Sequence, residues 1–345
     1  MAPAIENAVL EMALSPRPIP LPGPRVESYG YNPGSELLAA VTALEYGRRG
    51  KVSGQQLERL IAKARRLTAD LVAAQRGDGG WSWHGGSGQA TDWPSTCRTY
   101  WALIQARDAG IAVDLDTINK ATGFLQNRFR SFGANDHEGK AVVLHALSVN
   151  SQADYANLNR LYRARNELGN AALAYTALGF LQLKRPEVAT ELAGILESKL
   201  EMAEKPVDAP PVAYLKHGAR YPYLQDDLET TALALLLFAE TKPNTAKGEA
   251  AAQYLMQRRG CFGWQPGKVR GPAVAALAAW FGVAADTRTD YRVAVEVNGK
   301  EVGTVNSTEA QQTRAFEVPE ETLVHGENRI VFKMAGRGKY VYAAT

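Results

Sequence analysis

The sequence has few of the residues that build metal sites and disulfide frameworks. It contains 2 cysteines and 5 histidines in 345 residues. Two cysteines cannot form a framework, so we interpret Cys97 and Cys261 as small semi-buried residues, with a single bridge as the alternative. The histidines form no i,i+4 pair and have no cysteine at ligand spacing. We therefore expect no metal and no cofactor.

Long apolar runs and an excess of one charge are also missing. No apolar run reaches the roughly 18 residues needed to span a bilayer, and no basic-then-apolar export signal follows Met1. The net charge is only +3, and basic residues alternate with acidic ones, which argues against a nucleic-acid partner. The missing signal indicates either a cytoplasmic protein or a piece of a longer exported chain.

What is present is typical of a globular protein with one large domain and something smaller. Apolar residues make up 46% of the chain and charged residues 22%. Residues 1–28 form a separate N-terminal part. It has a predicted short strand at 9–14, and five prolines between Pro16 and Pro24 predict an extended linker after it.

From Ser35 to about residue 284 the apolar pattern is helical. The predicted helices cover 35–48, 53–75, 95–109, 114–130, 137–149, 153–166, 170–184, 186–203, 227–240, 244–258 and 269–284. Helices that are apolar nearly all round alternate with helices that carry a charged face, as expected of an inner and an outer layer. Six inner helices predict an α/α toroid over 29–285, with an open α-solenoid as the alternative.

One pattern occurs near both ends of this helical region. In 75–110 and again in 254–281, a helix ends in Arg and Gly, a Gly-Trp pair follows, and an Ala-rich helix begins after a proline. Two copies of one pattern support a closed or stacked repeat.

After Asp286 the period changes to two. Val293, Val295 and Val297 alternate with polar residues, and Asn298-Gly299 predicts a tight hairpin. Further strands are predicted within 327–334 and 338–344. These strands make half of a β-sandwich in 286–345, which the strand at 9–14 is a candidate to complete.

The acidic pair Asp226-Asp227 has two interpretations. Neighbouring carboxylates can supply the acid of a terpene cyclase, but these two stand at a helix start, where capping is favoured. Glu229 then occupies the third helical position of a capping-box variant. Gly77, Gly79 and Gly80 do not form a phosphate loop, because no Lys-Ser/Thr pair and no preceding strand accompany them.

Aromatic residues concentrate in the loops at the starts of inner helices. We interpret them as a plug that packs the mouth of the toroid, and alternatively as a shallow binding surface for a peptide, a glycan or a neighbouring domain. The candidate surface residues are Trp81, Trp83, His84, Trp93, Tyr221, Tyr223 and Trp264.

In the order of its motifs the chain resembles the thioester-containing domain of bacterial α2-macroglobulin-like proteins. The matching segments are QRGDGGWSW, LNRLYRARNELGNAALAYTALGFLQLKRPEVATELAGIL, DLETTALALLLFAE and YLMQRRGCFGWQPGKVRGPAVAALAAWF. The segments VEVNGKEVG and HGENRIVFKMAGRGKYVY resemble the β-rich segment that follows that domain. The resemblance implies a toroid like that of terpenoid cyclases and prenyltransferases, in a large extracytoplasmic chain of the endopeptidase-inhibitor family.

The resemblance also implies where a thioester would form. The family joins the cysteine and glutamine of a Cys-x-Glu-Gln motif, preceded by Tyr-Pro-Tyr-Gly, at the start of the first toroid helix. The corresponding stretch here runs from Tyr29 to Glu36, with Pro33 in the place of the thiol and Glu36 in the place of the glutamine. Proline is no nucleophile and an ionised carboxylate is a poor acyl donor, so we predict that no thioester forms.

Two functional hypotheses follow. The first is a non-enzymatic, thioester-lacking fragment that acts by protein contact or protease trapping in a parent chain. The second is a toroid enzyme acting on an isoprenoid or a polysaccharide, which needs an open cavity with an inward-pointing acid.

Overall fold

The computed structural model describes residues 32–49, 54–83, 90–203, 210–260, 263–284, 290–306 and 316–337. The predicted strand at 9–14, the linker up to residue 28, the predicted strand within 338–344, His84 and Cys261 lie outside these ranges.

Eleven α-helices occur within the described ranges, one for each predicted helix. They are α2 (Pro33–Arg49), α3 (Gly54–Ala73), α4 (Trp93–Asp108), α5 (Leu115–Ser131), α6 (His137–Ser148), α7 (Tyr155–Arg163), α8 (Asn170–Gln182), α9 (Pro186–Ser198), α10 (Asp227–Thr241), α11 (Ala246–Gln257) and α12 (Arg270–Ala284). The prediction was wrong at the end of α9. That helix stops at Ser198, and strand β1 (Glu201–Met202) pairs antiparallel with β2 (Ala213–Tyr214).

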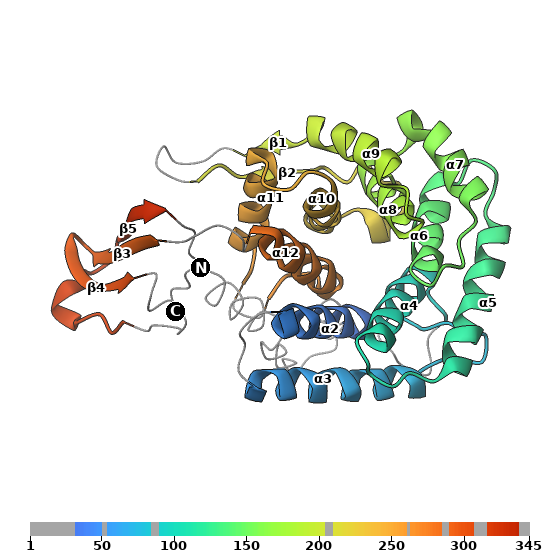
Figure 1. The fold of residues 1–345 in the computed structure, drawn as a ribbon, viewed down its shortest axis with the longest axis horizontal. Coiled ribbons are helices and arrows are strands. Elements are labelled where there is room, and N and C mark those ends of the chain that lie inside the picture. The colour runs from blue at the N-terminus through green and yellow to red at the C-terminus, as the bar shows by residue number, and fades with distance from the viewer. Residues whose placement is uncertain are drawn as a thin grey trace.

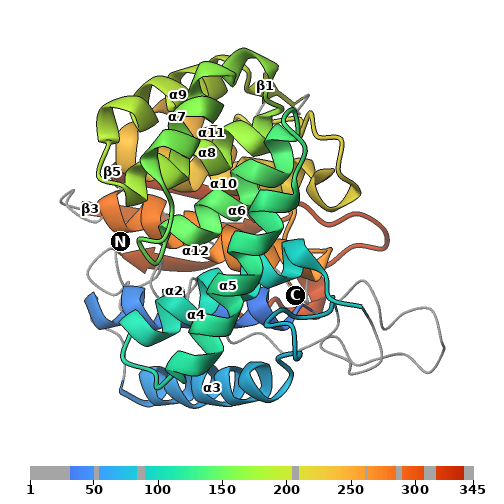
Figure 2. The same ribbon diagram turned by 90° about the vertical axis from the view of Figure 1, so that its right-hand side faces the viewer.

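The helices form two concentric layers, as Figure 1 shows. The even-numbered helices from α2 to α12 make the inner ring, and the odd-numbered helices from α3 to α11 lie outside them. Helix α3 occupies the outer edge in this view and in the view turned by 90° (Figure 2). Burial follows the same division, because α8 is buried without interruption over 171–180, whereas α3 buries only five side chains along one stripe.

The ring is closed, because α12 packs directly against α2. The hydroxyl of Ser35 donates to the carbonyl of Lys268 and accepts from the backbone N–H of Gly271, each at 2.7 Å. A Cβ at Gly271 would lie 2.8 Å from the carbonyl oxygen of Ser35, so only glycine permits this approach. Closure confirms the predicted toroid over the open solenoid.

The two copies of the Gly-Trp pattern make the same kind of hydrogen bond. The indole N–H of Trp81 donates to the carbonyl of Leu71, and that of Trp264 donates to the carbonyl of Leu255, both at 2.7 Å. Each accepting carbonyl lies in the last turn of an outer helix, where carbonyls lack helical partners. Each tryptophan therefore caps the helix that precedes it.

Helix starts are fixed by acidic caps. Asp92 accepts from the N–H of Ser95 at 2.9 Å, and Pro94 follows inside the first turn of α4. Asp114 caps α5 through the N–H of Thr117 at 3.1 Å. The predicted capping role of Asp226 at α10 is confirmed as well.

Beyond the ring, β3 (Asp290–Val297), β4 (Lys300–Asn306) and β5 (Ile330–Arg337) form an antiparallel sheet in the order β4-β3-β5. Asn298 and Gly299 join β3 to β4 with φ of 51° and 84°, the positive values that the predicted tight hairpin requires. Val293, Val295 and Val297 are buried on one face. The described strands make one sheet, half of the predicted sandwich.

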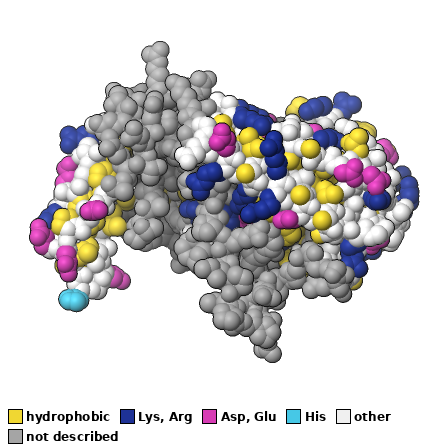
Figure 3. All heavy atoms as spheres, turned by 90° about the horizontal axis from the view of Figure 1, so that it is seen from below, with side chains coloured by type: hydrophobic (Ala, Val, Ile, Leu, Met, Phe, Trp, Pro, Cys, Tyr) yellow, Lys and Arg dark blue, Asp and Glu magenta, His cyan; other side chains and the backbone are white. Residues whose placement is uncertain are grey.

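The outward face of α3 is polar. Figure 3 views the molecule from this side, where basic and acidic side chains lie interspersed. Arg59, Arg65 and Arg66 of α3 are exposed. None of the described helices is long and apolar enough to cross a membrane.

Candidate functional site

The most unusual chemistry of the molecule lies inside the ring, where charged side chains from three elements meet. Arg98 of α4 donates to Glu229 of α10 and, at 3.0 Å, to the hydroxyl of Tyr175 of α8. Lys268, from the short helix η3 (Gly267–Val269), reaches the other carboxylate oxygen of Glu229 at 2.7 Å. The charged side chains are no more than 5% exposed. Glu229 therefore forms ion pairs with two buried cations, Arg98 and Lys268.

The sequence predicts a different role for Glu229, as the third residue of a capping box. Asp226 caps α10 by accepting from the N–H groups of Leu228 and Glu229 at 2.9 and 3.0 Å. The carboxylate of Glu229 points instead to Arg98 and Lys268, so the capping-box prediction was wrong for this residue.

A second buried ion cluster lies at the start of α2. Glu36 is 4% exposed, and its carboxylate lies 3.0 Å from the guanidinium of Arg270 and 3.1 Å from the ammonium of Lys63. Pro33 is the first residue of the helix, and Asn32 caps it by accepting from the N–H of Ser35 at 2.9 Å. The two residues at the expected thioester positions thus start a helix and hold two cations.

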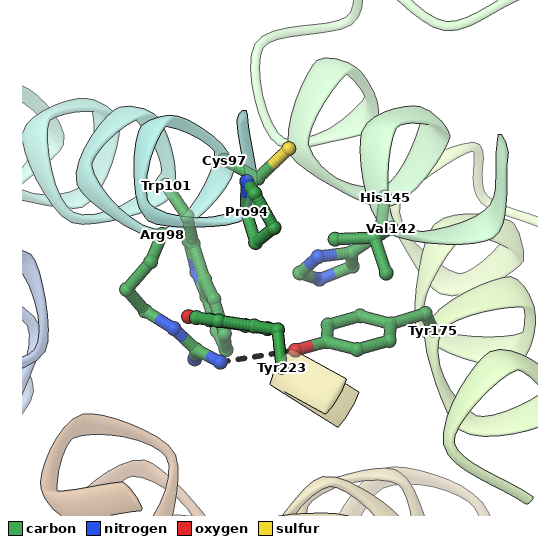
Figure 4. Close-up of a pocket in the computed structure, with 8 residues that line it drawn as sticks. All are labelled: Pro94, Cys97, Arg98, Trp101, Val142, His145, Tyr175 and Tyr223. Atoms are coloured by element: carbon green, nitrogen blue, oxygen red, sulfur yellow. Dashed lines mark hydrogen bonds between the residues drawn. The ribbon is translucent and has the colours of Figure 1, made fainter. Parts of the chain in front are cut away.

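A cavity of about 10 Å³ adjoins the first cluster. Its lining residues, drawn in Figure 4, are Pro94, Cys97, Arg98, Trp101, Val142, His145, Tyr175 and Tyr223. This volume is at the lower limit for one water molecule and far below that of a substrate pocket.

Cys97 and His145 both line this cavity, but they do not form a reactive pair. Burial raises the pKa of the Cys97 thiol well above its usual range, and burial together with the charge of Arg98 lowers the pKa of His145 to about 3. In Figure 4 the sulfur of Cys97 points away from Arg98. At neutral pH the thiol and the imidazole are both uncharged, whereas a nucleophilic cysteine needs a thiolate.

The predicted aromatic surface divides into three groups. Trp81 and Trp264 are each 1% exposed, so their burial does not support a surface role. Trp83 packs edge-on against Tyr223 with ring centres 5.1 Å apart, and Trp93 packs edge-on against Tyr221 at 5.5 Å. These four residues are partly buried. Trp83 precedes α4 and Trp93 begins it, so the two pairs connect this segment to the loop before α10. His84 lies outside the described residues.

The loop that carries Tyr221 and Tyr223 is anchored at the mouth of the ring. The carboxylate of Glu138 accepts from the backbone N–H groups of Arg220, at 2.8 Å, and Tyr221, at 3.1 Å. The hydroxyl of Tyr221 donates to Asp136, and Lys268 donates to the carbonyl of Tyr223. This loop therefore contacts the buried cluster through the bond from Lys268 to the carbonyl of Tyr223.

No group of three or more His, Cys, Asp or Glu side chains within the described part of the chain is placed to hold a metal ion.

Solved structures with the same arrangement include bacterial α2-macroglobulins. A point variant of the Salmonella protein superposes with a TM-score of 0.58 at 14% identity, over 90% of this chain and 20% of that one. The Escherichia coli segment from domain MG7 to the C-terminus gives 0.54 at 15% identity, over 90% of this chain and 47% of that one. The fold is that of the C-terminal region of bacterial α2-macroglobulins.

The chain matches only part of the length of the α2-macroglobulin structures. The native Escherichia coli α2-macroglobulin superposes with a TM-score of 0.56 at 14% identity, over 90% of this chain and 19% of that one. The chain thus spans about a fifth of the longer α2-macroglobulin structures and less than half of the shorter segment. No known family and no curated protein sequence matches it.

Proposed function

We propose that this chain is a thioester-lacking region of an α2-macroglobulin-like protein. It acts without catalysis, by protein contact or protease trapping within a longer exported chain. Its partners are a protease or the neighbouring domains of the same chain. The observation that carries the proposal is that Glu36, at the expected thioester position, is a carboxylate paired with Arg270 and Lys63 in a fold of the α2-macroglobulin type.

A thioester needs a thiol and an activated carboxamide at the start of the first toroid helix. Pro33 has no nucleophile, and Glu36 is a carboxylate placed 3.0 Å from Arg270 and 3.1 Å from Lys63. Each oxygen of this carboxylate pairs with one cation, and a carboxylate is the least reactive acyl form. Cys97 is the one free cysteine among the described residues, and it is buried in a different helix.

The enzyme alternative has one observation in its favour, since Glu229 is an inward-pointing acid. Its two carboxylate oxygens are each engaged by a buried cation, Arg98 and Lys268, so the group does not face an open site. The adjoining cavity of about 10 Å³ cannot hold an isoprenoid or a sugar. The filled interior therefore favours an interaction module.

Methylamine tests the absence of a thioester. One of the Salmonella structures is of α2-macroglobulin reacted with methylamine. We expect this chain, incubated with methylamine and measured by intact-mass spectrometry, to gain no mass and to release no new thiol. The variant Cys97→Ala serves as the control for side reactions of the thiol. A methylamine adduct at a single residue that disappears in this variant would refute the proposal.

Proteases test the mode of contact. Escherichia coli α2-macroglobulin has been solved in forms activated by trypsin and by porcine elastase. We expect any complex of the full-length parent chain with either protease to survive native sizing and to dissociate completely in denaturant. A complex that resists denaturant would show a covalent mechanism and overturn the proposal.

We further propose that the strand at 9–14 completes the β-segment 286–345, with the toroid inserted between them. Deletion of residues 1–14 should then accelerate amide exchange in β3–β5 and leave exchange in α2–α12 unchanged. Equal exchange in β3–β5 before and after the deletion would remove this part of the proposal.

A further inference from the structure

One inner helix lacks the kind of cap that starts its neighbours. Helices α4, α6 and α10 each follow an aspartate whose carboxylate accepts from a first-turn N–H. Helix α8 follows Gly169, which makes no side-chain capping bond. Its first-turn N–H groups need another acceptor, because no helical carbonyl precedes them. Residues 216–219 of the loop before α10, the cap turn, supply that acceptor.

The cap turn bonds to the starts of two inner helices. On the side of α8, the carbonyl of His217 accepts from the backbone N–H of Ala171 at 3.1 Å. The carbonyl of Lys216 accepts from the side chain of Asn170 at 2.8 Å. On the side of α10, the carboxylate of Asp227 accepts from the backbone N–H of His217 at 2.7 Å. The position of the turn therefore decides whether α8 is capped.

An imidazole closes the cap turn. The Nδ1 atom of His217 accepts from the backbone N–H of Ala219 at 2.8 Å. A side-chain acceptor two residues before the donating N–H is the arrangement of an Asx turn, with the imidazole nitrogen in the place of an aspartate or asparagine oxygen. Ala219 is 8% exposed, so its N–H has little access to water as a substitute acceptor.

The bond that closes the turn requires a neutral ring. A neutral imidazole has one acceptor nitrogen, whereas a charged imidazole has two N–H donors and no acceptor. A charged His217 would therefore turn a donor toward the N–H of Ala219, and this bond would be lost. Histidine ordinarily changes charge between about pH 5 and 8, whereas an aspartate cap ordinarily keeps its charge down to about pH 4.

No neighbouring acid is placed to hold the charged ring in the turn. The elements that contact the loop here carry the charged side chains Lys216 and Arg220 of the loop itself, Asp226 and Asp227 of the start of α10, Asp136 and Glu138 of the start of α6, and Glu201 of β1. Asp227 bonds to the backbone of His217, and none of the acids in the described part of the chain forms an ion pair with its ring. A proton on the ring therefore removes one bond of the turn and supplies no other.

We propose that His217 is an acid-sensitive switch for the cap of α8. When the ring takes up a proton, the bond to Ala219 breaks, the cap turn opens and the first turn of α8 loses its acceptor. The start of α6 keeps its aspartate cap over the same pH range. This device is independent of the proposed protein contacts and of the missing thioester.

Amide exchange of the full chain at about pH 7.5 and about pH 5.5 tests the switch, with each rate divided by that of an unstructured peptide at the same pH. We expect the protection of Ala219 and Ala171 to fall roughly tenfold at the lower pH, because a buried donor that loses its acceptor costs enough for that factor. Gly139 is the internal reference. Its N–H donates to Asp136 at 3.1 Å, so its protection should be retained.

The decisive variant is His217→Asn. The asparagine oxygen accepts in the same kind of turn and does not titrate, so the protection of Ala219 and Ala171 should be equal at the two pH values. The matched control is His137→Gln at the start of α6, where the imidazole lies 3.5 Å from Glu167 and far from the cap turn in sequence. This control should show the same fall as the unmodified chain.

An equal fall in His217→Asn and in the unmodified chain would overturn the proposal, as would unchanged protection of Ala219 in the unmodified chain. A second measurement needs no variant. Nuclear magnetic resonance of the unmodified chain follows the ring of His217 and the exchange of Ala219 through the same pH series. The two midpoints should coincide, and separate midpoints would assign the opening to another group and overturn the proposal.

Discussion

The buried histidine of the inner ring makes the stability of the fold sensitive to mild acid. His145 of α6 is 3% exposed and packs edge-on against Trp101 with ring centres 4.8 Å apart. Tyr175 contacts its ring from α8 at 5.2 Å, and Arg98 acts on it from α4. A protonated imidazole would be an unpaired cation beside a guanidinium, so burial first and Arg98 second lower its pKa from 6.5 to about 3.

The sign and size of the effect follow from linkage. Below about pH 6.5 the unfolded chain binds a proton at this histidine that the folded chain rejects, so stability is fully present above that pH and is lost as the pH falls toward 3. Each pH unit across this window costs about 1.4 kcal/mol. At about pH 4.5 the loss attributable to His145 is therefore about 3 kcal/mol.

Urea unfolding at about pH 7 and about pH 4.5 measures this loss. His145→Phe keeps an aromatic ring and cannot titrate, so its loss of unfolding free energy should be smaller than that of the unmodified chain by about 3 kcal/mol. His137→Gln, at the partly exposed start of α6, should retain the full loss. If the His145→Phe variant and the unmodified chain lose the same free energy, the histidine is not held neutral and the reasoning fails.

Three further perturbations test the ring, its caps and the hairpin. Glu229→Ala removes the shared partner of Arg98 and Lys268 and should lower the unfolding free energy by about 3–5 kcal/mol, measured by urea unfolding. The control Glu197→Ala, at a partly exposed residue, should cost about 1 kcal/mol or less, and equal losses would contradict the buried network. Trp264→Phe should cost about 1–3 kcal/mol in the same assay, because the buried carbonyl of Leu255 loses its donor; an unchanged midpoint would mean that the indole N–H is not needed. Gly299→Ala, at φ of +84°, should cost about 1–2 kcal/mol locally and be seen as faster amide exchange in β3 and β4; unchanged exchange would contradict the turn geometry.

The layered fold was predictable because apolar periodicity records how much of each helix is covered. Helix α8 is buried without interruption over 171–180, and its sequence is apolar all round for that reason. The hairpin was predictable because Asn298 and Gly299 are the residues that adopt positive φ in such a turn. Both signals are local in the chain, so they need no knowledge of distant contacts.

The interior charges were not predictable in this way. Arg98 and Glu229 are 131 residues apart, and each looks like an exposed position or a cap when its own helix is considered alone. The aromatic residues show the same limit, since Trp81 is fully buried and Trp83, two residues later, is only partly covered. Whether each of these side chains is buried depends on helices far away in the sequence, which come together only when the ring closes.

The residues at the start of α2 have a structural role in closing the ring. The segment from Asn32 to Glu36 caps its own helix, bonds to Gly271 through Ser35 and pairs Glu36 with Arg270, so it fastens the first inner helix to the last. Replacing Glu36 with the glutamine of a thioester would remove the charge that pairs with Arg270 of α12 and Lys63 of α3. Removing one member of a buried ion pair costs several kcal/mol, a large fraction of a typical domain's stability. Under the proposed function, a thioester at this position would require Arg270 and Lys63 to change together with Pro33 and Glu36.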